Sequence, residues 1–182
     1  MNAPPIIVIG NGIAGITTAR HIRKKSTKPI LIISKESRFF FSRTALMYVY
    51  MGHLKWEHTQ PYENHFWKKN KLDLLEETVT QIDPKKKTIR LSNESILSYD
   101  SLVLATGSIP NKFGWPGENL KGVQGLYTKQ DLENLEALTT SIQETVIVGG
   151  GLIGIELAEM LHARGKKVTF LVREKSFWSN VL

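Results

Sequence analysis

The run PIIVIGNGIAG at residues 5–15 decides the fold of this chain. The four apolar residues Ile6–Ile9 predict a buried parallel strand. After it, Gly10, Gly12 and Gly15 have the spacing G-x-G-x-x-G. In such a motif the first glycine allows a tight turn, the second lets the backbone approach a pyrophosphate, and the third lets a helix pack closely on the strand. The run therefore predicts a dinucleotide site, with the pyrophosphate at the start of a helix.

A helix, a second strand and an acidic residue complete the unit. Residues 13–25 predict the helix, and residues 29–33 predict the second strand of a βαβ unit. Glu36 lies 21 residues after Gly15, where an acid would hydrogen-bond a ribose 2′-OH. A glycine motif alone can serve packing, but here the strand, the helix, the second strand and the acid are all present.

The same pattern returns near the C-terminus. Residues 145–148 predict a strand, and GGGLIG at residues 149–154 repeats the glycine spacing 139 residues after the first motif. A helix and a further strand follow over residues 155–172, and Glu174 lies 20 residues after the last glycine. Two dinucleotide sites in one chain suggest that two dinucleotides meet. The useful pair is a flavin and a nicotinamide, because a hydride can pass directly between them.

The middle of the chain predicts an antiparallel meander. Its expected strands cover residues 72–75, 78–82, 88–91 and 95–98, with turns between them. The apolar run 100–105 then predicts another buried parallel strand. Together with the two βαβ units, this pattern predicts an α/β fold.

Three further helices are expected, over residues 44–51, 61–69 and 131–138. The stretch 109–125 is rich in glycine and proline, which marks a domain boundary. We therefore predict one Rossmann-like domain over residues 1–111 and a second over residues 112–182. The chain stops just after the second strand of the second unit, whereas a doubly wound domain needs more strands. We expect the second domain to be incomplete and the chain to be C-terminally truncated.

The net charge and the composition limit the classes of ligand and partner that we expect for this protein. The net charge of +7 could steer anionic ligands such as dinucleotides, or match an acidic protein partner. Nucleic-acid binding is not expected, because the basic residues are scattered and the longest basic run is only Lys85–Lys87. No stretch resembles a signal peptide or a membrane span, so we expect a cytoplasmic protein without a transmembrane segment.

The chain contains no cysteine, which excludes disulfides, thiolate metal sites and dithiol catalysis within it. The five histidines lack the spacing of metal ligands. We therefore expect no metal site.

The ordered motifs resemble those of the FAD-dependent pyridine nucleotide oxidoreductases. The resemblance rests on VIGNGIAG (8–15), Glu36, YDSLVLATGSIP (99–110) and IVGGGLIGIELAEML (147–161), and it spans nearly the whole chain. It implies that the first unit, a βαβ unit with the meander, is part of an FAD domain. The second unit would be a partial NAD(P) domain. In this family the FAD domain is discontinuous, and the chain returns to it after the NAD(P) domain.

The resemblance also implies cofactor-binding residues. Those implied for FAD are Gly10, Gly12, Ala14, Gly15, Glu36, Arg43, Val79, Ala105, Thr106 and Gly107. Those implied for NAD(P)H are Gly149, Gly151, Ile153, Gly154, Arg173 and Glu174.

Some of these assignments leave alternatives open. Arg43 would contact an FAD phosphate, or form a surface salt bridge. Glu156 matches an acid near the nicotinamide ring and is the candidate catalytic residue; the alternative is a carboxylate on a helix surface. Arg173 would suit the 2′-phosphate of NADPH, whereas Glu174 would suit the 2′-OH of NADH.

Two departures from the family pattern bear on the electron acceptor. The single cysteine of one branch would fall near residues 42–44 and is missing, so the flavin itself must pass electrons on. A lysine that lies close to the flavin in ferredoxin reductases is replaced by Tyr48. The nitrite reductase and ferredoxin reductase group remains the nearest match. A redox protein, a quinone, oxygen or a further cofactor domain could be the acceptor.

The predicted function is FAD-dependent NAD(P)H oxidation, with a homodimer as a further expectation for the full-length protein. Residues 1–182 alone are expected to be inactive, because the segment that returns to the flavin is missing. The alternative is a non-catalytic nucleotide-binding or assembly module that uses the same fold. Bleaching of the flavin absorbance by NADH would distinguish the two.

Overall fold

The computed structural model describes residues 3–173, 175 and 177. The chain forms two compact units, one of residues 1–42 with 60–109 and the other of residues 43–59 with 110–182. The segment 43–59 thus packs with the second unit, although it precedes most of the first unit's strands in sequence. Among the described helices, none is long and apolar enough to cross a membrane.

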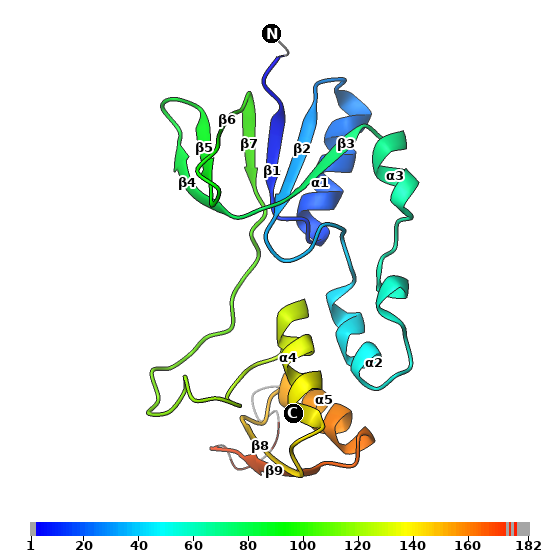
Figure 1. The fold of residues 1–182 in the computed structure, drawn as a ribbon, viewed down its shortest axis with the longest axis vertical. Coiled ribbons are helices and arrows are strands. Elements are labelled where there is room, and N and C mark those ends of the chain that lie inside the picture. Colours follow the sequence, from blue (N-terminus) through cyan, green and yellow to red (C-terminus); the bar gives the residue numbers. More distant parts are fainter. Residues whose placement is uncertain (1–2, 174, 176, 178–182) are drawn as a thin grey trace. The chain divides into compact units, whose positions relative to one another are not determined.

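A parallel sheet forms the centre of the first unit (Figure 1). Its strands are β1 (Ile6–Ile9), β2 (Ile30–Ser34), β3 (Leu72–Glu76) and β7 (Ser101–Leu104), in the order β3-β2-β1-β7. All three pairs in this sheet are parallel. From β1 the sheet continues to β2 on one side and to β7 on the other. The carboxyl end of β1 is therefore a topological switch point, where open α/β sheets bind ligands.

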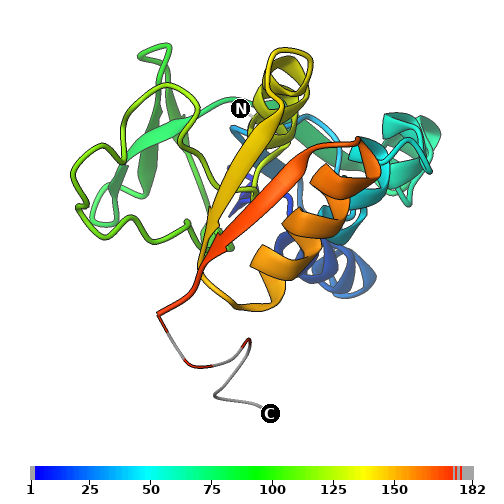
Figure 2. The same ribbon diagram turned by 90° about the horizontal axis from the view of Figure 1, so that it is seen from below.

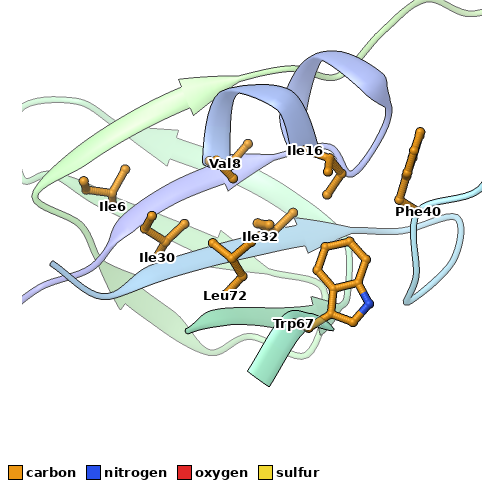
Figure 3. Close-up of a cluster of buried hydrophobic side chains, with 9 residues drawn as sticks. Ile6, Val8, Ile16, Ile30, Ile32, Phe40, Trp67 and Leu72 are labelled. Carbon is orange, nitrogen blue, oxygen red and sulfur yellow. The ribbon is translucent and has the colours of Figure 1, made fainter. Parts of the chain in front are cut away.

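Helices α1 (Ile13–Lys25) and α3 (Asn64–Lys69) contribute to the core on one face of this sheet. Figure 3 shows side chains from β1, β2 and β3 in one cluster with Ile16 of α1 and Trp67 of α3. Successive strand residues point to opposite faces, so Ile7 and Ile33 join a second cluster with Ile89, Leu91 and Tyr99. Burial on both faces explains why the two central strands, β1 and β2, are nearly continuous apolar runs.

The antiparallel meander has three strands, β4 (Val79–Asp83), β5 (Thr88–Leu91) and β6 (Ile96–Ser98). The prediction that residues 72–75 form its first strand was wrong, because β3 pairs in parallel with β2. The alternation in this stretch suits any strand with one well-covered face. It is the preceding helix α3 that lets the chain return to the sheet in parallel.

The second unit contains α4 (Lys129–Thr139), β8 (Glu144–Val148), α5 (Leu152–Ala163) and β9 (Lys167–Leu171). Strands β8 and β9 pair in parallel, and α5 lies against them (Figure 2). This is the second βαβ unit predicted from the sequence.

The segment 43–59 carries helix α2 (Leu46–Tyr50), which packs against α4 and α5. Tyr50 is fully buried, and its hydroxyl lies 2.6 Å from Oγ1 of Thr139. The Arg164 guanidinium donates to the Tyr50 carbonyl at 2.6 Å and lies over the Tyr50 ring. These polar contacts tie the segment to the second unit.

Two carboxylates in the first unit make its stability depend on pH. The pKa of Asp100 is lowered, chiefly by the hydrogen bond from Lys28 at 2.9 Å and then by that from Ser101. The pKa of Glu77 is lowered by the Ser92 hydroxyl and then by the Thr78 amide. A lowered folded-state pKa means that these contacts stabilise the unit fully above the unfolded-state pKa of about 4. That stabilisation is lost as the pH falls through the folded-state values.

We therefore expect the urea midpoint of the first unit to fall as the pH drops from about 5 toward 3. Asp100→Asn should flatten this decline, because the side chain no longer titrates. Urea unfolding followed by circular dichroism at several pH values measures the effect. High salt should weaken it, since the Lys28–Asp100 pair is exposed. An unchanged slope in the variant would contradict the assignment.

Candidate functional site

The turn between β1 and α1 is built around two glycines that exclude side chains. Gly10 has a φ of +107°, and its amide donates to the Ile33 carbonyl at 2.7 Å. A Cβ at Gly10 would lie well under 3.0 Å from the Ala105 carbonyl oxygen, and a Cβ at Gly15 equally close to the Gly10 carbonyl oxygen. We call the first glycine motif (residues 10–15) the first crook. It has no room for a side chain at either outer glycine, because Gly10 packs on the backbone of Ala105 and Gly15 packs on that of Gly10.

The turn between β8 and α5 repeats this geometry. Gly149 has a φ of +114°, and its amide donates to the Leu171 carbonyl at 2.9 Å. A Cβ at Gly154 would lie 2.7 Å from the Gly149 carbonyl oxygen. We call residues 149–154 the second crook. In each crook the first glycine therefore has a positive φ, and the last glycine packs against the carbonyl oxygen of the first.

The middle glycine of each crook faces open space instead. A Cβ at Gly12 or at Gly151 would meet no heavy atom within 4 Å among the described residues. The φ values of −69° and −82° would also permit other residues. Neither packing nor backbone strain requires glycine there. A ligand that approaches the backbone closely would require it, which fits a pyrophosphate.

The starts of both helices offer amide groups to such a ligand. The first helical bond of α1 runs from the Ile16 amide to the Gly12 carbonyl at 3.0 Å, and that of α5 from Ile155 to Gly151 at 3.2 Å. In the described chain no side chain caps either helix and neither first turn holds an acidic residue. The free amides and the positive end of the helix dipole therefore favour an anion.

Helix α4 provides a contrast within the same chain. Thr128 accepts from the Asp131 amide, and the Asp131 carboxylate accepts in turn from the Thr128 amide. This capping box satisfies the start of α4 with its own side chains. The two helices that follow glycine motifs leave their first amides uncapped, as an anion-binding function requires.

The carboxyl end of β7 lies beside the first crook. Ala105 donates its amide to the Ile9 carbonyl at 2.8 Å, and Gly107, two residues further on, has a φ of +71°. Thr106 and Val79 line one hollow of about 340 Å³. The hollow's lining residues are Ile9, Val79, Thr80, Gln81, Ile82, Leu104 and Thr106. The structure thus brings together site residues that lie far apart in the sequence.

The loop after β2 is tied to the first crook by Asn11, which sequence reasoning missed. The Asn11 side-chain amide donates to the Ser37 carbonyl at 2.7 Å, and Glu36 immediately precedes that acceptor. Asn11 and Ser37 are both buried. A polar residue between two glycines of a turn was the available signal, because a buried amide must find a partner.

The remaining predicted residues are placed as follows. Ala14 is exposed in the first turn of α1, and Ile153 is exposed in the first turn of α5. Glu156 is half-buried on α5. Arg173 is exposed, just after β9. Glu174 lies outside the described residues.

Arg43 belongs to the second unit. Its guanidinium donates to the Tyr127 carbonyl and lies 4.3 Å from the centre of the Tyr127 ring. Phosphate binding by Arg43 stays a prediction.

No group of three or more His, Asp or Glu side chains suited to a metal ion occurs in the part of the chain that the structure describes. A hollow of about 560 Å³ lies at the C-terminal end of α5, lined by His162 and Lys166 among others. This is the opposite end of the helix from the second crook, so the hollow does not belong to the glycine site.

Comparisons with known proteins agree with this geometry. A sequence model described as pyridine nucleotide-disulphide oxidoreductase matches residues 4–181. A probable ferredoxin reductase of Castellaniella defragrans is 33% identical over 163 residues, which cover 88% of this chain and 40% of that protein. The ferredoxin–NAD(+) reductase subunit of the Pseudomonas putida benzene 1,2-dioxygenase system is 33% identical over 168 residues, which cover 91% of this chain and 41% of that protein.

The fold also matches solved structures. The crystal structure of a ferredoxin reductase from Rhodopseudomonas palustris superposes with a TM-score of 0.88 at 24% identity, covering 99% of this chain and 45% of that one. At this identity the likeness shows the fold alone. The family resemblance and the α/β fold predicted from the motifs are thereby confirmed. The chain spans about two fifths of the length of the curated relatives, at 40% and 41%.

Proposed function

Because the chain belongs to the pyridine nucleotide-disulphide oxidoreductase family, we propose that its protein is an FAD-dependent NAD(P)H oxidoreductase. The observation that carries the proposal is the pair of crooks with matching geometry: each has a first glycine with positive φ, a last glycine packed on the carbonyl oxygen of the first, and a middle glycine that faces open space. One crook alone would fit many nucleotide-binding proteins. Two crooks provide for two dinucleotides, which is what hydride transfer between cofactors needs.

The first unit would hold FAD. The uncapped amides of α1 would bind the pyrophosphate at Gly12, and Glu36 would hydrogen-bond the adenosine ribose. Val79, which lines the hollow together with Thr106, would contact the adenine. Ala105, Thr106 and Gly107 would lie along the cofactor. When bound, FAD would accept the hydride of NAD(P)H and supply the redox chemistry that no side chain of this chain can supply.

The second unit would hold NAD(P)H. The amides of α5 would bind its pyrophosphate at Gly151, with Ile153 and Gly154 beside it. Glu156 would lie on the same helix, near the nicotinamide, where a carboxylate can orient the ring. Arg173 and Glu174 would decide between NADPH and NADH, the first through the 2′-phosphate and the second through the 2′-OH.

The electron acceptor is proposed to be a small redox protein of the ferredoxin type. Two of the relatives are named as ferredoxin reductases. The absence of cysteine from the sequence removes the dithiol relay that a disulfide substrate would need. The net charge of +7 would also favour an acidic protein as partner. Location in the cytoplasm and assembly as a homodimer are parts of the same proposal.

The test is reduction of the flavin in protein purified at its natural length. We expect a yellow protein whose flavin absorbance bleaches when NADH or NADPH is added without oxygen. Subsequent addition of an oxidised ferredoxin should restore the colour. A colourless protein that takes up no FAD would refute the proposal. A protein that binds FAD but is reduced by neither nucleotide would support the non-catalytic module instead.

A further inference from the structure

The chain after β7 presents two aromatic rings to the solvent. Phe113 is 67% exposed and Trp115 is 49% exposed. Their rings stack at an angle of 19°, with the ring centres 5.4 Å apart. Phenylalanine and tryptophan normally bury most of their apolar surface, and single exposed apolar residues need no explanation. An ordered pair of such rings on the surface of a loop instead indicates an interaction site.

Hydrogen bonds within the loop hold the two rings in place. Gly114 lies between them with a φ of +74°, and its amide donates to the Glu118 carboxylate at 2.8 Å. The Glu118 amide donates in turn to the Trp115 carbonyl at 3.1 Å. A Cβ at Gly114 would meet no described atom within 4 Å, so it is the positive φ that requires glycine there. The rings are thus preorganised, which lowers the entropic cost of binding a partner.

The charge around the rings is positive. Lys112 and Lys121 are both exposed, and the Lys112 ammonium donates to the side-chain oxygen of Asn119 at 3.3 Å. The one acid of the stretch 112–121 is Glu118, which is half-buried and accepts the amide of Gly114. The stretch therefore combines an apolar pair with a net positive charge. It fits a partner whose acidic surface surrounds an apolar contact.

This chemistry favours a small acidic protein over a membrane or a second copy of the chain. Recognition of anionic lipid takes clusters of about four to eight basic residues, whereas this stretch offers Lys112 and Lys121. In a twofold dimer the same surface meets itself, so the lysines of the two copies would repel one another. Charge complementarity thus selects an acidic partner.

We propose that residues 112–121, which we call the aromatic loop, form the docking surface for the acidic redox protein that receives the electrons. Phe113 and Trp115 would be its apolar centre, and Lys112 and Lys121 its charged rim. This inference rests on the proposed function, from which it takes the class of the acceptor. One NAD(P)H supplies two electrons, so two molecules of a one-electron carrier would dock and be reduced in turn, and one proton would be released.

The aromatic loop follows the proposed FAD site closely in the sequence. Gly107, which is proposed to lie along the cofactor, precedes Lys112 by five residues. Five residues of fully extended chain span at most about 18 Å. A protein docked at the start of the loop would therefore be tethered near a residue of the flavin site, as electron transfer requires.

The test uses holoenzyme of natural length and compares a protein acceptor with a small one. Oxidised [2Fe–2S] ferredoxin is the protein probe, and ferricyanide is the reference that needs no docking surface. NADH or NADPH is the donor for both. The double variant Phe113→Ala, Trp115→Ala should raise the KM for ferredoxin at least about tenfold, as expected when interface anchors are lost. Its rate of ferricyanide reduction should match that of the wild type.

Two further variants separate the orientation of the rings and the charge from the rings themselves. Gly114→Ala keeps both rings but strains the backbone at a φ of +74°, so it should also raise the KM for ferredoxin. Lys112→Gln with Lys121→Gln should flatten the rise of that KM with ionic strength. The matched control, Lys85→Gln with Lys86→Gln, removes two exposed lysines from the turn after β4. It should retain the wild-type salt dependence.

Several results would refute the docking surface and leave the proposed flavin chemistry intact. One is an unchanged KM for ferredoxin in the loop variants together with normal ferricyanide reduction. Another is a clearly lowered thermal midpoint in Phe113→Ala, Trp115→Ala, because it would show that these rings are buried in the natural-length protein. A third is loss of a dimer, or of binding to phosphatidylserine vesicles, in the same variant, because it would assign the loop to a different occupant.

Two results with the wild type reach further. Reduction of ferricyanide without reduction of ferredoxin would overturn the proposed acceptor, and the docking surface with it. A flavin that neither nucleotide reduces would overturn the proposed function as a whole, and this inference would fail for that reason.

Discussion

Gly15→Ala should destabilise the first unit by about 3 kcal/mol, enough to lower its thermal midpoint by roughly 12 to 24 °C. Within a helix, replacing glycine by alanine normally stabilises by up to about 1 kcal/mol. Here the added Cβ would overlap the Gly10 carbonyl oxygen, and it would also lie 3.4 Å from the Ala105 side chain. A backbone oxygen in a closed turn cannot move aside without separating α1 from β1. The overlap should therefore outweigh the gain in helix propensity.

A series of three substitutions makes this argument quantitative. The overlap is deepest at Gly15, less deep at Gly154, where the nearest atom is at 2.7 Å, and absent at Gly12, where no described atom lies within 4 Å. The loss of stability in the corresponding alanine variants should follow the same order. Differential scanning calorimetry or urea unfolding measures it. Stabilisation by Gly15→Ala would show that the turn relaxes freely, and that helix propensity dominates.

Much of this architecture could be predicted because local patterns determine it. The apolar run Ile6–Ile9 had to be buried on both faces, and the glycine motif after it permits only a tight turn into a helix. The helix start at residue 13 and the parallel strand after Tyr99 follow from the same reasoning. These features depend on neighbours within a few residues, which a single sequence displays.

Other features depend on partners that are distant in sequence. The strand over residues 72–76 has the alternation of a meander strand, and only its pairing with β2 places it in the parallel sheet. The segment 43–59 packs with the second unit because Tyr50 finds Thr139 and Arg164 there. The sequence shows that these side chains exist, but it does not show which distant group each one meets.

The residues of the candidate site also fall into these two groups, those that local sequence predicts and those that depend on distant partners. Its glycines can be recognised in the sequence because their G-x-G-x-x-G spacing indicates the backbone role of each one. Asn11 cannot, because its importance lies in a hydrogen bond to a carbonyl 26 residues away. The hollow that contains Val79 and Thr106 likewise arises only when the meander folds against the end of β7. Backbone-binding positions can thus be read from a motif, whereas positioning residues require the fold.

Gly12→Ala should reduce FAD affinity by about 10- to 100-fold while the protein keeps its fold. The φ of −69° suits alanine, and the added Cβ meets no described atom within 4 Å, so stability should hardly change. The same Cβ would project into the space where a pyrophosphate approaches the amides of α1. Lengthening those charge-assisted hydrogen bonds costs about 1.5–3 kcal/mol for one lost bond, which corresponds to the expected loss in affinity. Flavin fluorescence quenching measures the affinity, and circular dichroism verifies the fold.

Gly151→Ala is the matched variant in the second crook, where the added Cβ again meets no described atom within 4 Å. It should weaken NAD(P)H binding by a similar factor and leave FAD affinity unchanged, whereas Gly12→Ala should leave NAD(P)H affinity unchanged. Such a reciprocal result would assign one dinucleotide to each crook, because a general loss of stability would weaken both ligands in both variants. If the two variants affect the same nucleotide, or if neither affects binding, the open space at the middle glycines is not where the pyrophosphates lie. In that case the matching geometry of the crooks would reflect only the packing of their outer glycines, Gly10 with Gly15 and Gly149 with Gly154.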